Sequence, residues 1–538
     1  MNSQFDQETR VWKGVKVPYP FAGDVYVNEL VIGGLRKTPG RIVQLSADDD
    51  AVSTSDEMLL KIIRIAQNLT KLGIKNEDVI AVICSNSLDL MAYTNGIIQT
   101  GAIINPMSVD HSADDLTNMF KQTKPKLVIC DYQILGKIHS VLSALNNDSP
   151  VYTTWEKVDG VRIAEDLYKP TGIEDQYQPP KFINPNTKIM AILTSSGSSG
   201  PGKGVCMSQS FFLKSFGVAP PECRSLTFSP IFWGSAFGSL IMSTFTSEVR
   251  VVTRQPFSPQ RFIDIATRLK VTHFLLNPPS LTLLLQSPLV DDMDKSNVQL
   301  ILSLGGILSE SLRARLIAVF PKAVYMIFYG LTEVSCSMTF PGFPIADLNC
   351  GFVFPNHQMK VVDDDGKALL PGEVGEFYTK FNVCPFLGYY NNPQGTKDAL
   401  DDEGYVKTGD LGYINEQGFV YVIDRKKDIF KYRGHQINPV EIENVLNEIK
   451  GVEFVAVVAI PNPETYNLTA AVIQKKKGFD DLSEQEVIDH VASRMPVYKQ
   501  IHGGVYFVDK FPTTATDKIL KLETKEIAIT RHLEKQKK

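Results

Sequence analysis

Segments with the apolar spacing of helices alternate with buried, β-rich segments from residue 55 to residue 304, and this alternation restricts the folds open to the chain most strongly. Apolar residues recur on one helix face in 55–72, and the β-rich run 79–84 follows Gly73. A mostly apolar stretch at 88–100 continues the pattern, as do strands expected up to 104 and at 127–130, 189–193, 274–276 and 300–304. Such alternation predicts an α/β fold of layered, mostly parallel sheets.

A β-rich run meets a dense cluster of charges at 421–428, Tyr-Val-Ile-Asp-Arg-Lys-Lys-Asp, which indicates a linker. Beyond it the sequence predicts a separate α+β unit with a helix that opens on the capping box of Ser483 and Glu486. The other elements expected there are a helix at 439–449 and strands at 452–460, 468–473 and 505–508. We therefore expect an N-terminal domain at 1–425, a hinge at 426–428 and a C-terminal domain at 429–538.

Length and charge exclude several classes of protein. The chain has 538 residues, more than the roughly 100–200 of a single domain, and its formal charge of -5 gives no basic surface for a nucleic acid. Seven scattered cysteines without a Cys-x-x-Cys pair favour a reducing compartment without structural zinc. Since no apolar run reaches about 18 residues, we expect no membrane span. A cytoplasmic location is expected, with the peroxisome as the alternative, although the C-terminus is not Ser-Lys-Leu.

The segment 194–205, Thr-Ser-Ser-Gly-Ser-Ser-Gly-Pro-Gly-Lys-Gly-Val, has the composition of a phosphate-binding loop. Glycines let backbone N–H groups approach an anion, hydroxyls add donors, and the lysine adds a positive charge. The segment is not a Walker A loop, and flexible surface loops have a similar composition. The candidate phosphate ligands are Ser195, Ser196, Gly197, Ser198, Ser199, Gly200 and Lys203.

A second motif, Tyr-Gly-Leu-Thr-Glu at 329–333, follows an apolar run. Tyr329 can stack on a purine, and Thr332 can donate to a phosphate. Glu333 offers the carboxylate that Mg²⁺ takes together with phosphate and water. The alternative interpretation is a tight turn with a solvated glutamate.

A third segment ends in Thr-Gly-Asp, where Asp410 can accept the two hydroxyls of a ribose, although surface β-turns have the same pattern. Asp-Arg-Lys-Lys-Asp at 424–428, Lys-Tyr-Arg-Gly at 431–434 and a lysine near the end follow in order. With these motifs the chain resembles the adenylate-forming superfamily of acyl-CoA synthetases, 4-coumarate:CoA ligases and firefly luciferase. The likeness covers nearly the whole chain and includes Gly305 and Gly306.

The resemblance implies ATP, Mg²⁺ and coenzyme A as cofactors. It also implies a β-barrel-like part in the large N-terminal domain, and a small, mobile α+β C-terminal domain. The serine- and glycine-rich loop would hold the β- and γ-phosphates, Tyr329 would lie near the adenine, and Thr332 would contact the α-phosphate. Glu333 would bind Mg²⁺, and Asp410, beside Arg425, would bind the ribose hydroxyls. Further nucleotide contacts are implied for Gly305, Gly306 and Gly330.

The resemblance implies separate tasks for three lysines of the C-terminal region. Lys518 would bridge the substrate carboxylate and the α-phosphate. Lys427 would lie at the hinge, and Lys431 would lie on the face that swings in for the second half-reaction. On that face Gly434 would line the tunnel for the pantetheine arm of coenzyme A.

The chemistry gives these residue types a physical purpose. A carboxylate has no good leaving group, so it must first attack the α-phosphate of ATP and expel pyrophosphate. Two anions then have to meet, and Mg²⁺ on Glu333 together with the ammonium of Lys518 would offset their repulsion. A thiol then displaces AMP after the small domain rotates about Lys427.

The sequence departs from the family pattern at several positions. Gly202 stands where a proline is usual, and Asp517 stands where a glycine usually precedes the terminal lysine. The segment at 232–234 carries Phe232 and Trp233 where one or two histidines are common, and the bulky Ile307 follows the glycine pair. We assign Phe232, Trp233, Gly234 and Ile307 to an acyl pocket; a core aromatic pair is the alternative for the first two.

The sequence therefore predicts an AMP-forming acid–thiol ligase with a fatty or aromatic acid and coenzyme A as its small-molecule partners. A luciferase-like oxygenase is one alternative, against which Phe232 and Trp233 argue. A nucleotide-binding pseudoenzyme is the other, suggested by Gly202 and Asp517. The sequence predicts neither the particular acid nor the oligomeric state.

Overall fold

The fold is described from a computed structural model of the chain. It describes residues 3–19, 21, 25–182, 184–195, 202–215, 222–306, 308–338, 348–514 and 518–536. Six candidate site residues and one departure from the family pattern lie outside these ranges: Ser196, Gly197, Ser198, Ser199, Gly200, Ile307 and Asp517.

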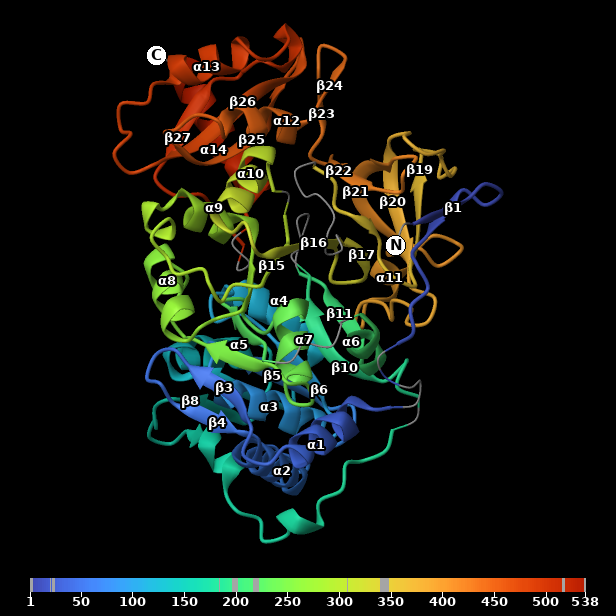
Figure 1. Cartoon of the computed structure of the whole chain (residues 1–538), viewed down its shortest axis with the longest axis vertical. Helices are drawn as coiled ribbons and strands as arrows, with labels where there is room; N and C mark the ends of the chain where they lie inside the picture. Colours follow the sequence, from blue (N-terminus) through green and yellow to red (C-terminus); the bar gives the residue numbers. More distant parts are fainter. Residues whose placement is uncertain are drawn as a thin grey trace.

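The first sheet is built from the alternating elements that the sequence predicts. Its seven described strands run in the order β11-β10-β6-β5-β7-β8-β9, and all neighbours are parallel except β10 and β11. The strands are β5 (Val79–Ile83), β6 (Ile103–Pro106), β7 (Leu127–Asp131), β8 (Val151–Thr154), β9 (Arg162–Ile163), β10 (Ile189–Thr194) and β11 (Gly204–Ser208). The helices of this region are α1 (Val27–Lys37), α2 (Ser55–Lys71), α3 (Asp89–Ile98), α4 (Ala113–Thr123), α5 (Leu135–Ala144) and α6 (Gln209–Ser215). The predicted helix–strand alternation is confirmed here (Figure 1).

The second sheet lies beside the first. Its nine described strands run β18-β17-β16-β15-β14-β12-β13-β3-β4, with a parallel centre and antiparallel edges. They are β3 (Ile42–Ser46), β4 (Val52–Thr54), β12 (Arg224–Thr227), β13 (Val249–Val252), β14 (His273–Leu276), β15 (Leu300–Leu304), β16 (Val324–Gly330), β17 (Ser335–Met338) and β18 (Phe352–Val353). The accompanying helices are α7 (Gly234–Met242), α8 (Pro259–Arg268), α9 (Pro278–Gln286) and α10 (Glu310–Val319). Strands β5 and β7 of the first sheet are buried at every residue, as expected for parallel strands covered on both faces, whereas β15 and β16 of the second sheet are only partly buried.

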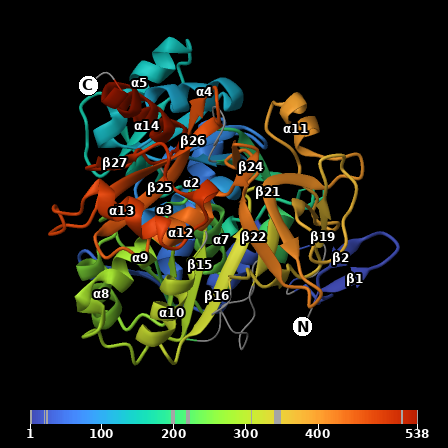
Figure 2. The ribbon, with the colours of Figure 1, turned by 90° about the horizontal axis from the view of Figure 1, so that it is seen from above.

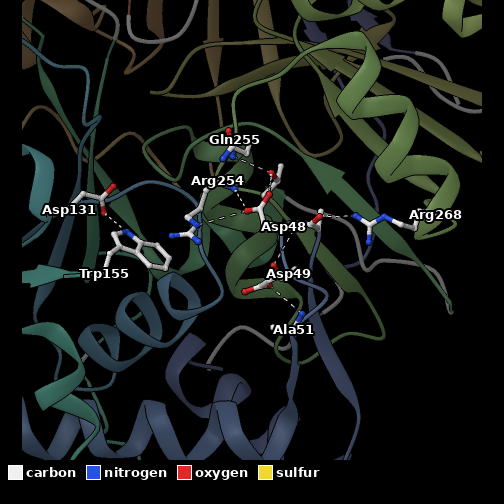
Figure 3. A network of polar contacts seen from close by, with 11 residues as sticks. Asp48, Asp49, Ala51, Asp131, Trp155, Arg254, Gln255 and Arg268 are labelled. Carbon is white, nitrogen blue, oxygen red and sulfur yellow. Dashed lines mark hydrogen bonds and ion pairs between the residues drawn. The ribbon is translucent and has the colours of Figure 1, made fainter. Parts of the chain in front are cut away.

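A polar network joins the ends of the two sheets (Figure 3). The guanidinium of Arg254, which follows β13, lies 4.0 Å from the ring centre of Trp155, which follows β8. The indole N–H of Trp155 donates to Asp131 Oδ1 at 3.1 Å, and the backbone N–H of Arg254 donates to Asp48 Oδ2 at 2.8 Å. Trp155 has a φ of 76°, a strained backbone conformation for an aromatic residue. Its side-chain contacts with Arg254 and Asp131 hold it in place.

A third, antiparallel sheet combines the start of the chain with residues 358–425. Its order is β1-β2-β19-β20-β21-β22, from β1 (Gln4–Asp6), β2 (Val11–Lys13), β19 (Gln358–Val362), β20 (Gly375–Lys380), β21 (Val406–Ile414) and β22 (Val420–Arg425). The short helix α11 (Pro393–Ala399) lies between β20 and β21 in the sequence. The expected β-barrel-like part is not confirmed, because β1 and β22 are the two edges of this sheet and do not pair with each other among the described residues.

The C-terminal part has its own sheets and its own buried core. It contains β23 (Phe430–Tyr432), β24 (His435–Ile437), α12 (Pro439–Leu446), β25 (Val452–Asn462), β26 (Tyr466–Lys475), α13 (Glu484–Ala492), β27 (Val505–Val508) and α14 (Lys521–Gln536). The predicted capping box of Ser483 and Glu486 is present at α13. Figure 1 shows this domain at one end of the molecule, and Figure 2, seen from that end, shows α12 beside β22, with which it is in contact. None of the described helices combines the length and the apolar character needed to cross a membrane.

Candidate active site

A cavity of about 980 Å³ lies between the large N-terminal part and the C-terminal domain. Its wall on the large side includes the ends of β15 and β16 and parts of β21 and β22, and its opposite wall comes from the C-terminal domain. The candidate residues that line this cavity, on one wall or the other, are Gly305, Gly306, Tyr329, Gly330, Asp410, Arg425, Lys427 and Lys518. The structure therefore brings together residues that lie up to 213 positions apart, since 518 minus 305 is 213.

Asp410 is the polar centre of the large-side wall. It pairs with Arg425 across β21 and β22, and Arg425 Nε lies 2.8 Å from Asp410 Oδ1. The hydroxyl of Tyr329 donates to the other carboxylate oxygen at 2.7 Å. Burial raises the pKa of Asp410, while Arg425, Tyr329 and Lys518 act to lower it. The carboxylate is thus held in a fixed orientation with oxygen lone pairs left to accept further hydrogen bonds.

Lys518 reaches into the same cavity from the opposite wall. Its Cε lies 3.9 Å from the position that a Cβ on Gly305 would take, and Gly305 has a φ of 95°. The positive φ of the turn after β15 explains the glycine at 305, and the distance to Lys518 is an ordinary van der Waals contact. Burial and then Arg425 lower the pKa of Lys518, and Asp410 opposes them. The residue nevertheless keeps an exposed surface, so it is accessible from solvent.

A second group joins the phosphate-loop lysine to the candidate metal ligand. The hydroxyl of Tyr389 donates to Glu333 Oε1 at 2.7 Å, and Lys203 Nζ lies 4.6 Å from the ring centre of Tyr389. Glu333 follows β16 in a tight turn closed by hydrogen bonds between Leu331 and Val334. The turn of the alternative interpretation is present, but the glutamate is half-buried and hydrogen-bonded rather than fully solvated.

The ends of the phosphate loop are held by the β10–β11 pair. The backbone N–H of Ser195 donates to the carbonyl of Lys203 at 2.9 Å. A Cβ on Gly202 would lie 2.7 Å from Cγ2 of Thr194, closer than side chains tolerate. Gly202 thus lies close against the side chain of Thr194, which a larger residue at 202 would have to displace.

Several candidate residues lie outside the cavity wall. Phe232 is buried, and its ring lies 6.4 Å from that of Trp233 in an edge-on arrangement. These two and Gly234 are not part of this wall, so their assignment to an acyl pocket stays a prediction, with a core aromatic pair as the alternative for the two rings. Lys431 and Gly434 are exposed on the β23–β24 hairpin, also away from the cavity wall.

Sequence reasoning missed three residues that the structure places at or near the site. Tyr389 connects Lys203 to Glu333, and the Gly-Tyr-Tyr triplet at 388–390 was its only signal. Asp424 and Lys521 both line the cavity. They belong to segments already singled out for Arg425 and Lys518, so proximity in the sequence was a usable signal.

The fold and the cavity define a class: an α/β enzyme with a small C-terminal domain set over a polar cleft at the ends of parallel strands. The chain belongs to the AMP-binding enzyme family. The model of that family matches residues 34–390, and the model of the AMP-binding enzyme C-terminal domain matches residues 441–518.

Individual relatives agree with this assignment. The chain is 27% identical to a probable 4-coumarate–CoA ligase 3 of Dictyostelium discoideum, covering 93% of this chain and 95% of the relative. It is 28% identical to a luciferin 4-monooxygenase of Photuris pensylvanica, covering 86% and 88%. Two solved structures share the fold. ATP-bound MatB from Rhodopseudomonas palustris has a TM-score of 0.82 at 22% identity, covering 94% of this chain and 100% of that one. The anthranilate CoA ligase AuaEII in complex with anthranoyl-AMP has a TM-score of 0.85 at 19% identity, covering 95% and 98%.

Proposed function

We propose that the chain activates a carboxylic acid with ATP, forms an acyl-adenylate and transfers the acyl group to coenzyme A. The observation that carries this proposal is the meeting of Asp410, Arg425 and Lys518 in one interdomain cavity. A carboxylate on one wall and an ammonium group on the other suit a nucleotide with a sugar at one end and a reacting phosphate at the other.

Asp410 binds the ribose of ATP in this proposal. Its two oxygens already accept from Tyr329 and contact Arg425, and each keeps a lone pair for a ribose hydroxyl. Tyr329 is thus a hydrogen-bond partner of Asp410 as well as a neighbour of the adenine. The glycines at 305, 306 and 330 leave room for the flat base between the strand ends.

Glu333 suits Mg²⁺, which takes one or two carboxylates and completes its shell with phosphates and water. Its carboxylate accepts a hydrogen bond from Tyr389, which orients it and leaves oxygen lone pairs for a metal ion. When bound, Mg²⁺ screens the charge on the phosphates. Lys203 beside Tyr389 and the loop from Ser195 bind the β- and γ-phosphates, and Thr332 donates to the α-phosphate.

Adenylation joins two anions, and Lys518 lowers their repulsion. The acid's carboxylate oxygen attacks the α-phosphorus, the bond to the bridging oxygen breaks, and pyrophosphate leaves with the electron pair. The ammonium of Lys518 stays between the carboxylate and the α-phosphate, where negative charge develops. A preorganised donor of this kind accelerates a reaction by about 10²–10³-fold.

Thioester formation requires another arrangement of the C-terminal domain. The thiol of coenzyme A attacks the acyl carbonyl, loses its proton, and AMP leaves. In the present arrangement Lys518 is in the cavity, while Lys431 and Gly434 are exposed outside it. We propose that residues 426–428, with Lys427, form a hinge between domains at 1–425 and 429–538, and that rotation exchanges the two faces.

The acid is proposed to be a fatty or aromatic acid. The names of two ligases to which the chain is similar, 4-coumarate–CoA ligase and anthranilate CoA ligase, support the aromatic choice. Purified protein is to be incubated with ATP, Mg²⁺, coenzyme A and a panel of such acids, with AMP, pyrophosphate and thioester measured separately. The proposal expects all three products with at least one acid. Tight ATP binding without release of pyrophosphate in the presence of any of the acids would contradict the proposal and favour a pseudoenzyme. Pyrophosphate release without thioester would contradict the transfer step alone.

A further inference from the structure

Lys521 stands among carboxylates from three parts of the chain. Its Nζ lies 3.4 Å from Oε1 of Glu443 on α12, and it also interacts electrostatically with Asp424 on β22 and Asp428 in the connection. We call Asp424, Asp428, Glu443 and Lys521 the interdomain charge cluster. All four line the cavity between the domains. Lys521 therefore forms an ion pair within its own domain and also interacts electrostatically with a carboxylate of the large domain and one of the connection.

Asp424 is an unusual member because its charge is buried. It is 6% exposed, and its Oδ1 accepts from the backbone N–H of the adjoining Arg425, at 2.7 Å. Within the described part of the chain, its Oδ2 is buried and has no hydrogen-bond partner. A buried carboxylate with an unsatisfied oxygen destabilises the arrangement that buries it unless a nearby cation compensates. Lys521 is the cation that acts most strongly on Asp424.

The cluster sits directly beside the residues proposed for adenylation. Asp424 adjoins Arg425, which contacts Asp410, and Lys521 follows Lys518 by three positions. Lys521 also begins α14, so its position fixes where the segment carrying Lys518 enters the helix. An attraction between Asp424 and Lys521 thus joins the strand behind the ribose carboxylate to the segment that carries the reacting lysine.

We propose that Lys521 is a positioning residue that compensates the buried charge of Asp424 and thereby holds Lys518 in the cavity for adenylation. This rests on the proposed function, and it adds a residue whose role is to position Lys518. Rotation of the C-terminal domain separates Lys521 and Glu443 from Asp424, so the compensation exists only in the arrangement with Lys518 inside.

The titration of Asp424 follows from the same geometry. Burial raises its pKa to about 6, against the lowering effect of Lys521, and Glu443 and Asp428 add to the rise. The three carboxylates together raise the pKa of Lys521. The raised pKa of Asp424 means that its carboxylate binds a proton better in this arrangement. A low pH therefore favours the arrangement with Lys518 inside, and ionisation of Asp424 above pH 6 opposes it. Charged Lys521 offsets that opposition at neutral pH.

The test uses full-length variants and two readouts at pH 7.5. Lys521→Met leaves the carboxylates uncompensated and is expected to lower acid-dependent ATP–pyrophosphate exchange at least about tenfold. Lys521→Arg keeps the charge and is expected to restore most of the rate. Asp424→Asn added to Lys521→Met removes the charge that needed compensation, so the double variant is expected to be faster than Lys521→Met alone. Lys535→Met is the matched control, since it removes an ion pair with Glu484 that lies within the C-terminal domain.

The second readout does not depend on activity. Trypsin can cut at Arg425, Lys426 and Lys427, and mass spectrometry measures the rate of cleavage there. Lys521→Met is expected to increase that rate at least about threefold without a matching increase elsewhere, and Asp424→Asn is expected to reverse it. A lower pH of 6 is expected to slow this cleavage in Lys521→Met relative to pH 7.5, after correction for trypsin activity on an unfolded peptide.

The outcomes separate the two proposals. If no acid supports exchange in the wild-type protein, the proposed function fails, while the trypsin readout still decides the role of Lys521. The positioning role is overturned if Lys521→Met and Lys521→Arg lose exchange activity equally. It is also overturned if the effects of Asp424→Asn and Lys521→Met on exchange simply add in the double variant. A trypsin rate that is the same in all variants also overturns it.

Discussion

Replacing Asp410 by asparagine tests the nucleotide site at its centre. The substitution keeps the size of the side chain but removes the negative charge that faces Tyr329 and Arg425. A hydrogen bond to a charged group contributes about 1.5–3 kcal/mol, so losing the charged acceptor for the ribose hydroxyls should weaken ATP binding about 10- to 150-fold. The cost to stability is smaller. The side chain of Arg425 is 38% exposed, so water screens the unpaired charge and the loss is about 1 kcal/mol.

Isothermal titration calorimetry with ATP and Mg²⁺, without acid, measures the affinity directly, and thermal unfolding measures the stability. Tyr329→Phe is the matched control, because it removes one neutral donor and leaves the carboxylate charge. It should weaken binding only about 2- to 12-fold, as expected for about 0.5–1.5 kcal/mol. ATP affinity of Asp410→Asn equal to that of the wild-type protein would refute the ribose role of Asp410.

Three further perturbations follow from the contacts of the site and the fold. Gly202→Ala places a Cβ 2.7 Å from Thr194 Cγ2 and should lower the free energy of unfolding by about 1–3 kcal/mol; an unchanged thermal midpoint would contradict the collision. Burial lowers the pKa of Lys518 below its ordinary 10.5, so its ammonium is lost earlier as pH rises and adenylation should decline on the alkaline side below pH 10.5. Lys518→Arg should move that decline to higher pH, and an identical alkaline limb in both proteins would count against the assignment. Arg254→Ala removes the contact with Trp155 and should cost about 0.5–1 kcal/mol at this partly exposed position, measured by urea unfolding.

The helix–strand alternation was predictable because the buried strands of parallel sheets leave a continuous apolar signal. Strands β5, β7, β10 and β15 coincide with apolar runs of the sequence, and turn-forming residues mark where these runs end. The β-barrel-like part of the N-terminal domain was expected from the resemblance and not from the apolar pattern, and it is not confirmed. Whether two edge strands pair depends on long-range register, and alternation within each strand carries no information about it.

The sequence motifs identified the residues that form the polar centre of the large-side wall. Asp410, Tyr329 and Arg425 were each singled out, and the structure joins them directly. The contact of Tyr389 with Glu333 was not predictable, because it depends on the bridge that sets residues 388–390 against β11. The charge of Asp424 is visible in the sequence, but its burial depends on the C-terminal domain that covers β22.

The most direct test of the central claim compares the two half-reactions in two lysine variants. Lys518→Ala should cut acyl-adenylate formation by about 10²–10³-fold, yet largely spare thioester formation from a supplied acyl-adenylate and coenzyme A. Lys431→Ala should show the opposite division, since Lys431 lies outside the cavity in the present arrangement. Equal losses of both half-reactions in each variant would contradict the account of one cavity served in turn by two faces of the C-terminal domain.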